Sequence, residues 1–277
     1  MKVNSFSMFG DKAKWSSGFA ANIRQHFTLY WDDSWAFWIY TDHELGDEGY
    51  CPVLKKLAEE GLIKVIVVPD EGKLYQKRLR CTMMLWRMLP IWENTEYVFC
   101  RDSDSILTPR QLQCVRSFIS SRKAVHGITD NVSHCIPLMG GMCGLHSPKF
   151  LEAMRSPSLN AFMTGIYTES GYTRFGYDQD FLMNAVWPHF QSSVLIHHLG
   201  GPNDRSANKI VTDAYMEDIP QMVREKGDDF TNYIGASGCS TSRGYFSSLE
   251  ICDFYNEYGN VKKCKIITDI EKNCGWR

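Results

Sequence analysis

The sequence has no run approaching 18 consecutive apolar residues, the length a membrane-spanning helix needs. Its first residues, MKVNSFSMFGDK, hold a hydrophobic patch far too short for a signal peptide. There is no internal repeat, no low-complexity segment and no long run of like charge, and 30 basic and 32 acidic residues give a net charge of −2. We therefore expect a soluble protein without a membrane anchor, and not one whose main partner is nucleic acid.

Ten cysteines are present, and no two of them form a C-x-x-C pair. Several stand in apolar contexts, where a free cysteine behaves as a small hydrophobic residue. A reduced, cytoplasmic protein is the expectation that follows. The last quarter of the chain leaves room for one disulfide of unassigned pairing among Cys239, Cys252, Cys264 and Cys274.

The 277 residues are 44% hydrophobic, and apolar runs alternate with helical patterns over the first half of the chain. This alternation predicts a doubly wound α/β domain, with strands covered on both faces of a mostly parallel sheet. In such sheets ligands bind beyond the carboxyl ends of the strands. The expected strands are Val3–Phe9, Ala36–Tyr40, Leu62–Val68, Glu96–Cys100 and Ser193–His197. The expected helices are Cys51–Glu60, Arg78–Trp92, ended or kinked by Pro90, and Pro109–Ser121, with Thr108 as its N-cap.

One apolar strand runs directly into two acidic residues, in the stretch YVFCRDSDSIL. Asp102 and Asp104 are separated by one serine, and burying like charges so close together is costly unless a cation lies nearby. Carboxylate oxygens at the end of a strand suit Mg²⁺ or Mn²⁺, above all when a diphosphate supplies further ligands. The alternative is a surface turn in which Ser103 and Ser105 are solvated.

Two further motifs lie on either side of this pair. Arg87, in WRMLP, stands on an apolar helix and needs an anionic partner, either a core carboxylate or a ligand phosphate. Gly140 and Gly141, in LMGGMCG, would let the backbone approach a ligand closely. The alternative for the glycines is a strand bulge or tight packing.

Acidic and histidine residues recur later in the chain. In GYDQDFLMNAVWP, Asp178, Gln179 and Asp180 stand at or just before a helix start, where Asp178 could also be an ordinary N-cap. In VLIHHLGG, an apolar run ends in His197 and His198. A neutral imidazole at the end of a strand can complete a metal site begun by two carboxylates, although a structural histidine is the alternative.

Taken in order, these motifs resemble the GT-A-fold glycosyltransferases, in particular the family of glycogenin and the bacterial lipooligosaccharide galactosyltransferases. That family shows an arginine on a helix, an apolar strand entering D-x-D, a small-residue turn, a D-Q-D-x-L-N helix start and a final H-x-x-G. This chain has one additional residue before Asn184 in the D-Q-D motif. The combination RDSDS, GGM and DQDFL also resembles soluble glycosyltransferases of large algal DNA viruses, which build glycans on capsid protein.

The resemblance implies a Mn²⁺ or Mg²⁺ site made by Asp102, Asp104 and a histidine, with His197 preferred over His198. It also implies that a UDP-sugar is the donor. The nucleotide sugar would lie against Phe6, Ser7, Asp42, Arg87, Asp102, Ser103, Gly140 and Gly141.

The implied catalytic residues are Asp178, Gln179 and Asp180. One of the two carboxylates would be the base if the reaction inverts the anomeric configuration, and Gln179 would lie near the anomeric carbon if it retains it. The sequence leaves both outcomes open.

The resulting hypothesis is transfer of a sugar, xylose or glucose, from a UDP-sugar to a hydroxyl of an acceptor glycan, and of a capsid glycan in host cytoplasm if the protein is viral. We expect an α/β GT-A catalytic domain over residues 1–205 and a C-terminal extension packed on it over residues 206–277. One alternative is a haloacid-dehalogenase-like phosphatase with Asp102 as nucleophile, which would want Thr or Val where Ile106 stands. The other is a non-catalytic carbohydrate-binding protein.

Overall fold

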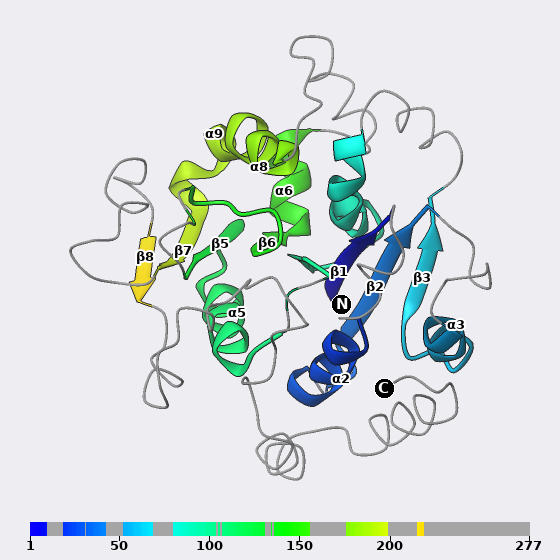
Figure 1. Cartoon of the computed structure of the whole chain (residues 1–277). Coiled ribbons are helices and arrows are strands. Elements are labelled where there is room, and N and C mark those ends of the chain that lie inside the picture. The colour runs from blue at the N-terminus through cyan, green and yellow to red at the C-terminus, as the bar shows by residue number, and fades with distance from the viewer. Residues whose placement is uncertain are drawn as a thin grey trace.

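The computed structural model describes residues 1–9, 19–30, 32–42, 52–68, 80–103, 105, 107–130, 134, 136–155, 176–198 and 215–218. These residues form an eight-stranded sheet in the order β3-β2-β1-β4-β6-β5-β7-β8 (Figure 1). Every neighbouring pair is parallel except the two that involve β6. The strands are β1 (Lys2–Met8), β2 (Trp35–Thr41), β3 (Lys64–Val67), β4 (Tyr97–Arg101), β5 (Val125–Thr129), β6 (Cys143–His146), β7 (Val194–His198) and β8 (Tyr215–Asp218).

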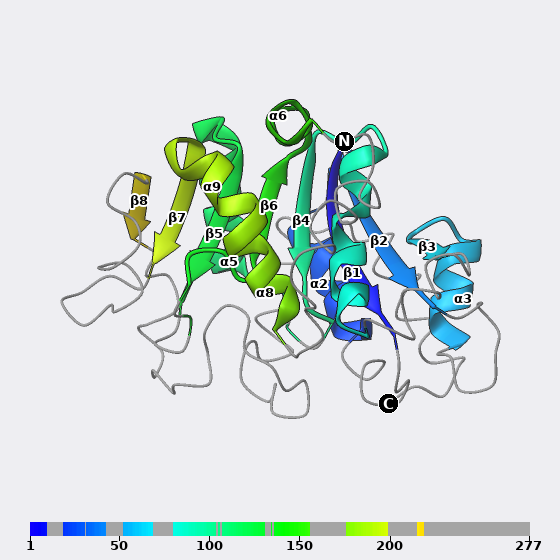
Figure 2. The ribbon, with the colours of Figure 1, turned by 90° about the horizontal axis from the view of Figure 1, so that it is seen from above.

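Helices cover both faces of the sheet: one group lies above the strands and another below them in Figure 1, and Figure 2 views the sheet from the upper face. One face, called the α5 face below, carries α2 (Phe19–Leu29) and α5 (Pro109–Ser121). The other, called the η1 face, carries the 3₁₀ helix η1 (Arg80–Trp92) and α6 (Ser147–Met154). A further helical segment on the η1 face consists of α8 (Tyr177–Phe181), the π-helical turn η2 (Leu182–Val186), α9 (Trp187–Phe190) and the 3₁₀ turn η3 (Gln191–Ser193). The remaining described helix, α3 (Pro52–Glu59), precedes β3 in the chain.

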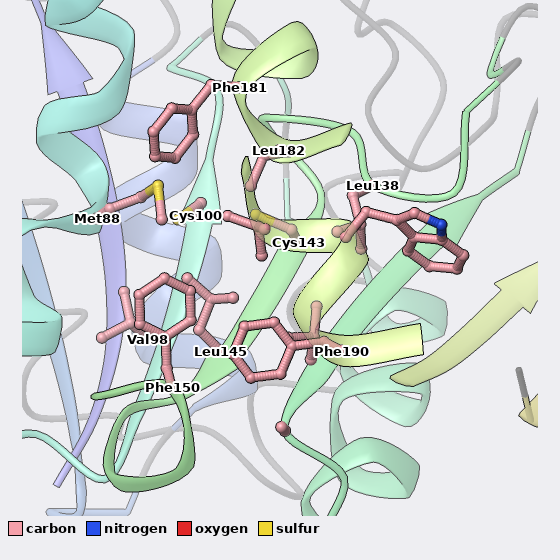
Figure 3. Close-up of a cluster of buried hydrophobic side chains, with 14 of the residues drawn as sticks. Met88, Val98, Cys100, Leu138, Cys143, Leu145, Phe150, Phe181, Leu182 and Phe190 are labelled. Carbon is pink, nitrogen blue, oxygen red and sulfur yellow. The ribbon is translucent and has the colours of Figure 1, made fainter. Parts of the chain in front are cut away.

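The larger hydrophobic core lies under the η1 face (Figure 3). Met88 of η1, Phe150 of α6 and Phe181 of α8 pack around Val98 of β4 and Leu145 of β6. A second core under the α5 face contains Phe99 and Leu195 from the sheet, with residues of α2 and α5 above them. Because alternate residues of β4 enter different cores, the strand is buried on both faces, as its unbroken apolar run predicts.

The expected α/β class, with a mostly parallel sheet flanked by helices, is confirmed, and this arrangement is consistent with a Rossmann-like GT-A fold. All five expected strands are present, with ends shifted by one or two residues. Thr108 caps α5 as expected, since its side chain accepts a hydrogen bond from the Gln111 N–H. The helix around Pro90 is 3₁₀ rather than α and continues two residues past the proline.

Two central strands, β5 and β6, were not expected. The antiparallel β6 holds only four residues, one of them Gly144, and ring carbons of Phe99 on the neighbouring strand lie 2.9 Å from the place of a Cβ at that position. A longer side chain would collide with the ring, so glycine is what allows β6 to pack here. The same glycine weakens the sequence signal for a strand, which is why β6 was not expected.

The predicted C-terminal extension, 206–277, contributes β8, which pairs with β7. The rest of that extension lies outside the described residues. Within the part of the chain that the structure describes, no helix is long and apolar enough to span a bilayer. Cys100, Cys114 and Cys143 are buried and form no disulfide, as expected for cysteines in apolar contexts.

Candidate functional site

The candidate site lies at the edge of the sheet where the parallel strands end. Asp102 follows the last residue of β4, and Gly140 and Gly141 precede the first residue of β6. Because β6 runs against its neighbours, its beginning meets the carboxyl ends of β4 and β5. The topology therefore brings the acidic motif and the glycine turn to one place, the edge at which doubly wound sheets bind ligands.

Arg87 joins two carboxylates that are far apart in the sequence. Its Nη1 donates to Asp102 Oδ1 and, at 3.2 Å, to the Arg101 carbonyl oxygen, while its Nη2 donates to Asp178 Oδ2 at 2.6 Å. The residue is 5% exposed. Burial lowers the pKa of Arg87, but the attraction of Asp102 and Asp178 outweighs it and raises that pKa, so the guanidinium stays charged.

The glycine turn lies directly under these carboxylates. A Cβ atom at Gly140 would stand 1.7 Å from Asp178 Oδ2, and one at Gly141 would stand 1.8 Å from Asp102 Oδ2. Each glycine thus leaves the space that one carboxylate occupies, which explains two adjacent positions without a side chain. The glycine pair serves the site by tight packing of protein groups.

Asp178 is not the N-cap of its helix. Gly176 takes that position with φ +84°, and no side chain caps the helix. Asp178 is 4% exposed and turned to Arg87, whereas the neighbouring Gln179 and Asp180 are half-buried. The local sequence DQD therefore divides into one buried structural carboxylate and two residues nearer the solvent.

The residue before Asn184 that is additional to the D-Q-D-x-L-N pattern lies in the π-helical turn η2. The Trp187 N–H donates to the Leu182 carbonyl oxygen, five positions earlier, instead of four. Phe181 and Leu182 at the start of the turn, and Val186 and Trp187 at its end, are all buried. A five-residue spacing thus keeps both ends of the helical segment on the same core.

The end of β1 is tied to the site through η1. Ser7 Oγ accepts from the Arg87 backbone N–H at 2.9 Å and donates to the Met84 carbonyl oxygen at 3.3 Å. Phe6, also expected to meet the nucleotide, is fully buried and stacks on Phe37 with ring centroids 4.4 Å apart, so its side chain is part of the core.

The other expected nucleotide residues are placed as follows. Asp42 is half-buried and follows the end of β2. Ser103 is buried, and its carbonyl oxygen accepts from the Asn22 side chain at 3.0 Å. Both follow the carboxyl ends of strands and lie in the region where a nucleotide is expected.

The preference for His197 over His198 does not agree with the direction of the side chains. The His197 ring is 1% exposed, lies on the α5 face and shares a hydrogen bond of 2.8 Å with His126. Successive residues of a strand point to opposite faces, and Ile196 packs in the core under the η1 face. His198 therefore lies on the face that carries Arg87, opposite to His197.

A complete metal site is not visible in the described residues. Asp104 lies outside them, and no three histidine, cysteine or acidic side chains gather there in a way that would hold an ion. Asp102 on its own suits a hard dication, because its carboxylate is 41% exposed at the end of a strand. The metal and its full ligand set remain a prediction.

Comparison with known proteins assigns no family to the chain. No family model matches the chain, and no curated protein is similar to it. Among solved structures, residues 1–349 of TarS from S. aureus, a staphylococcal glycosyltransferase, align with 78% of this chain and 60% of the TarS chain, at 11% identity and a TM-score of 0.39. So distant a likeness assigns no activity, substrate or residue role.

Sequence reasoning missed one residue at this edge, His134. It is 5% exposed, and its Nδ1 accepts from the Asp130 backbone N–H at 3.2 Å. Burial lowers the pKa of His134 to about 4, although the Asp102 carboxylate acts in the opposite direction. A single histidine between a strand and a glycine turn carries no motif, so only the fold could bring it to notice.

Proposed function

We propose that this chain is a nucleotide-sugar-dependent glycosyltransferase that moves a sugar from a UDP-sugar to a hydroxyl of an acceptor glycan. The observation that supports it most is the pairing of the D-x-D strand with the D-Q-D helix, made by Arg87 between Asp102 and Asp178. Both motifs belong to the glycosyltransferase pattern in the sequence. Their convergence on one arginine at the carboxyl edge is what a shared donor site requires.

In this proposal Arg87 has a different role from the one implied by the sequence. Both terminal nitrogens already bind protein oxygens, and the side chain is buried. Arg87 is therefore proposed to position Asp102 and Asp178 rather than to bind the diphosphate. Asp178 is occupied by this ion pair, so Gln179 and Asp180 are the residues left to act on the acceptor or the anomeric carbon.

The proposed Mn²⁺ or Mg²⁺ ligands are Asp102, Asp104 and His198. A dication there would offset the negative charge that grows on the diphosphate as the glycosidic bond breaks. The protein's contribution is to fix the carboxylate of Asp102 before the donor arrives, through Arg87 and the closely packed Gly141. Xylose and glucose are the proposed donor sugars, and a glycan, including a capsid glycan, is the proposed acceptor.

The test is a thermal-shift panel of UDP, UDP-xylose and UDP-glucose with and without Mn²⁺, followed by an assay of sugar transfer or donor hydrolysis. A ligand at 100 times its Kd stabilises the folded chain by about 2.7 kcal/mol. We expect a shift that needs both nucleotide and Mn²⁺, is lost in Asp104→Asn, and is kept in Glu59→Gln, a matched control on the exposed side of α3.

Absence of any shift across the panel would contradict the proposal. Hydrolysis of p-nitrophenyl phosphate would favour the phosphatase, and sugar binding that is indifferent to UDP and Mn²⁺ would favour the carbohydrate-binding protein.

A further inference from the structure

Helix α2 meets the carboxyl edge of the sheet from the α5 face. His26 of this helix shares a hydrogen bond of 3.1 Å with Asn4 of β1, and β4 is the neighbour of β1 in the sheet. Asn22 stands four residues before His26, so the two polar side chains lie on the same face of the helix. Asn22 is fully buried, and its amide contacts the chain that leaves β4.

The amide of Asn22 makes two hydrogen bonds to the backbone that follows β4. Its Nδ2 donates to the Ser103 carbonyl oxygen at 3.0 Å, and its Oδ1 accepts from the Leu107 backbone N–H at 3.1 Å. An asparagine side chain carries a donor and an acceptor next to each other, so it can pair with both groups without a charge. Because Ser103 and Leu107 are buried, loss of the amide would leave two buried backbone groups unpaired.

These two bonds hold the backbone on both sides of the second acidic residue of the D-x-D motif. Ser103 is the residue between the two acidic positions, and Leu107 follows the second of them by three positions. The first acidic residue, Asp102, is held by Arg87 from the η1 face. Asn22 holds the same segment from the α5 face, so the motif is fixed by one residue on each side of the sheet.

We propose that Asn22 is a positioning residue that keeps the segment from Asp102 to Leu107 in the shape that binds the donor diphosphate. The inference rests on the proposed function, since it places the donor at this segment. Arg87 orients one carboxylate, whereas Asn22 orients the backbone that carries both acidic side chains. A segment that also adopts other shapes binds its ligand more weakly, in proportion to the fraction of chains in the competent shape.

The test compares two buried substitutions of similar kind. Asn22→Leu keeps the size of the side chain and removes both hydrogen bonds. Thr95→Val is the matched control, because Thr95 Oγ1 donates to the Pro90 carbonyl oxygen at 2.8 Å and shares a bond of 2.8 Å with Ser147 Oγ, before the start of β4 and thus at the other end of that strand. Each variant leaves buried groups unpaired, and each should lower the melting temperature by about 4–8 °C.

Two measurements separate positioning from stability. The first is calorimetric titration of UDP in the presence of Mn²⁺, in which Asn22→Leu should bind about tenfold more weakly or worse. The second uses no ligand: hydrogen exchange of the Leu107 amide, followed by NMR, should be about tenfold faster in Asn22→Leu. We expect Thr95→Val to keep the wild-type value in both measurements, although it is destabilised to a similar extent.

A third variant, Asn22→Asp, tests the chemistry of the amide at nearly constant shape. An ionised carboxylate has no donor for the Ser103 carbonyl oxygen, whereas a neutral carboxyl group has a donor and an acceptor, as the amide does. Burial favours the neutral form, so lowering the pH should restore the pair of bonds. The UDP affinity of Asn22→Asp, divided by that of the wild type at the same pH, should therefore be higher at pH 5.5 than at pH 8.

Three results would overturn the inference while leaving the proposed function in place. They are equal weakening of UDP binding by Asn22→Leu and Thr95→Val or by neither, a Leu107 amide that exchanges at the wild-type rate in Asn22→Leu, and an affinity ratio of Asn22→Asp that does not change with pH. A wild-type chain that binds no UDP would overturn the proposed function and this role together. The exchange rate is measured without ligand, so it tells the two failures apart.

Discussion

Replacing Arg87 by methionine is expected to destabilise the chain mainly through Asp178. The side chain of Asp178 is 6% exposed, and that of Asp102 is 41% exposed. Removing one partner of a buried ion pair leaves an uncompensated charge, which costs about 3–5 kcal/mol, whereas an exposed pair contributes about 0–1 kcal/mol. At about 2 °C per kcal/mol for a chain of this size, Arg87→Met should lower the melting temperature by about 6–10 °C.

The design needs the double variant, because methionine also changes packing. Arg87→Met with Asp178→Asn removes both buried charges and should recover most of the loss, whereas Arg87→Met with Asp102→Asn should recover little. Melting temperatures and urea unfolding of the wild type, the single variants and both double variants give the two coupling energies. Equal recovery by the two double variants, or a melting temperature of Arg87→Met unchanged from wild type, would refute the assignment of Asp178 as the dependent group.

Three more outcomes follow from the geometry. Gly141→Ala should displace the carboxylate beside it and abolish the UDP-dependent thermal shift, while Gly61→Ala, with nothing within 4 Å, should cost only about 1 kcal/mol of stability from its left-handed backbone. Burial holds the pKa of His126 well below its usual value, so at mildly acidic pH the unfolded chain binds a proton that the folded chain does not. The free energy of unfolding should therefore fall as pH drops below about 6.5, and fall less steeply in His126→Phe. Urea unfolding of both chains from pH 7.5 to 5 measures this. Deletion of Met183 should be tolerated, because it turns the π-helical turn into regular α-helix while the same residues stay on the buried face. Deletion of Gln113 from the regular α5 should instead unfold the chain, because it rotates the following residues off their buried face. Circular dichroism of the two variants tests both outcomes.

Sequence reasoning found the sheet because its strands are continuous apolar runs with clear ends. Val98 and Phe99 enter different cores, so a run without alternation was the correct pattern for a strand buried on both faces. The same reasoning could not find β6, because a four-residue strand that contains Gly144 has no local preference for extended structure. Its pairing comes from the neighbouring strands and from the Phe99 ring, which packs 2.9 Å from the place of a Cβ at Gly144.

The grouping of site residues was predictable only as far as motif order and the carboxyl-edge rule reach. That Asp102, Asp178 and the glycines approach one another follows from those two considerations. Which histidine faces them does not, since a shift of one residue in a strand exchanges its two faces and the pairing partner is a tertiary property. The sharing of Arg87 between two carboxylates likewise depends on helix placement, which no local pattern specifies.

The burial of three thiols in the sheet and under it has a practical consequence. Cys100 and Cys143 stand on the neighbouring strands β4 and β6, and Cys114 lies on α5; all are at most 1% exposed. An alkylating reagent can reach these sulfur atoms only in molecules whose central strands have separated or whose α5 has lifted. Mass spectrometry of pulse-alkylated peptides would therefore measure separately how often β4, β6 and α5 open locally at equilibrium, without any engineered probe.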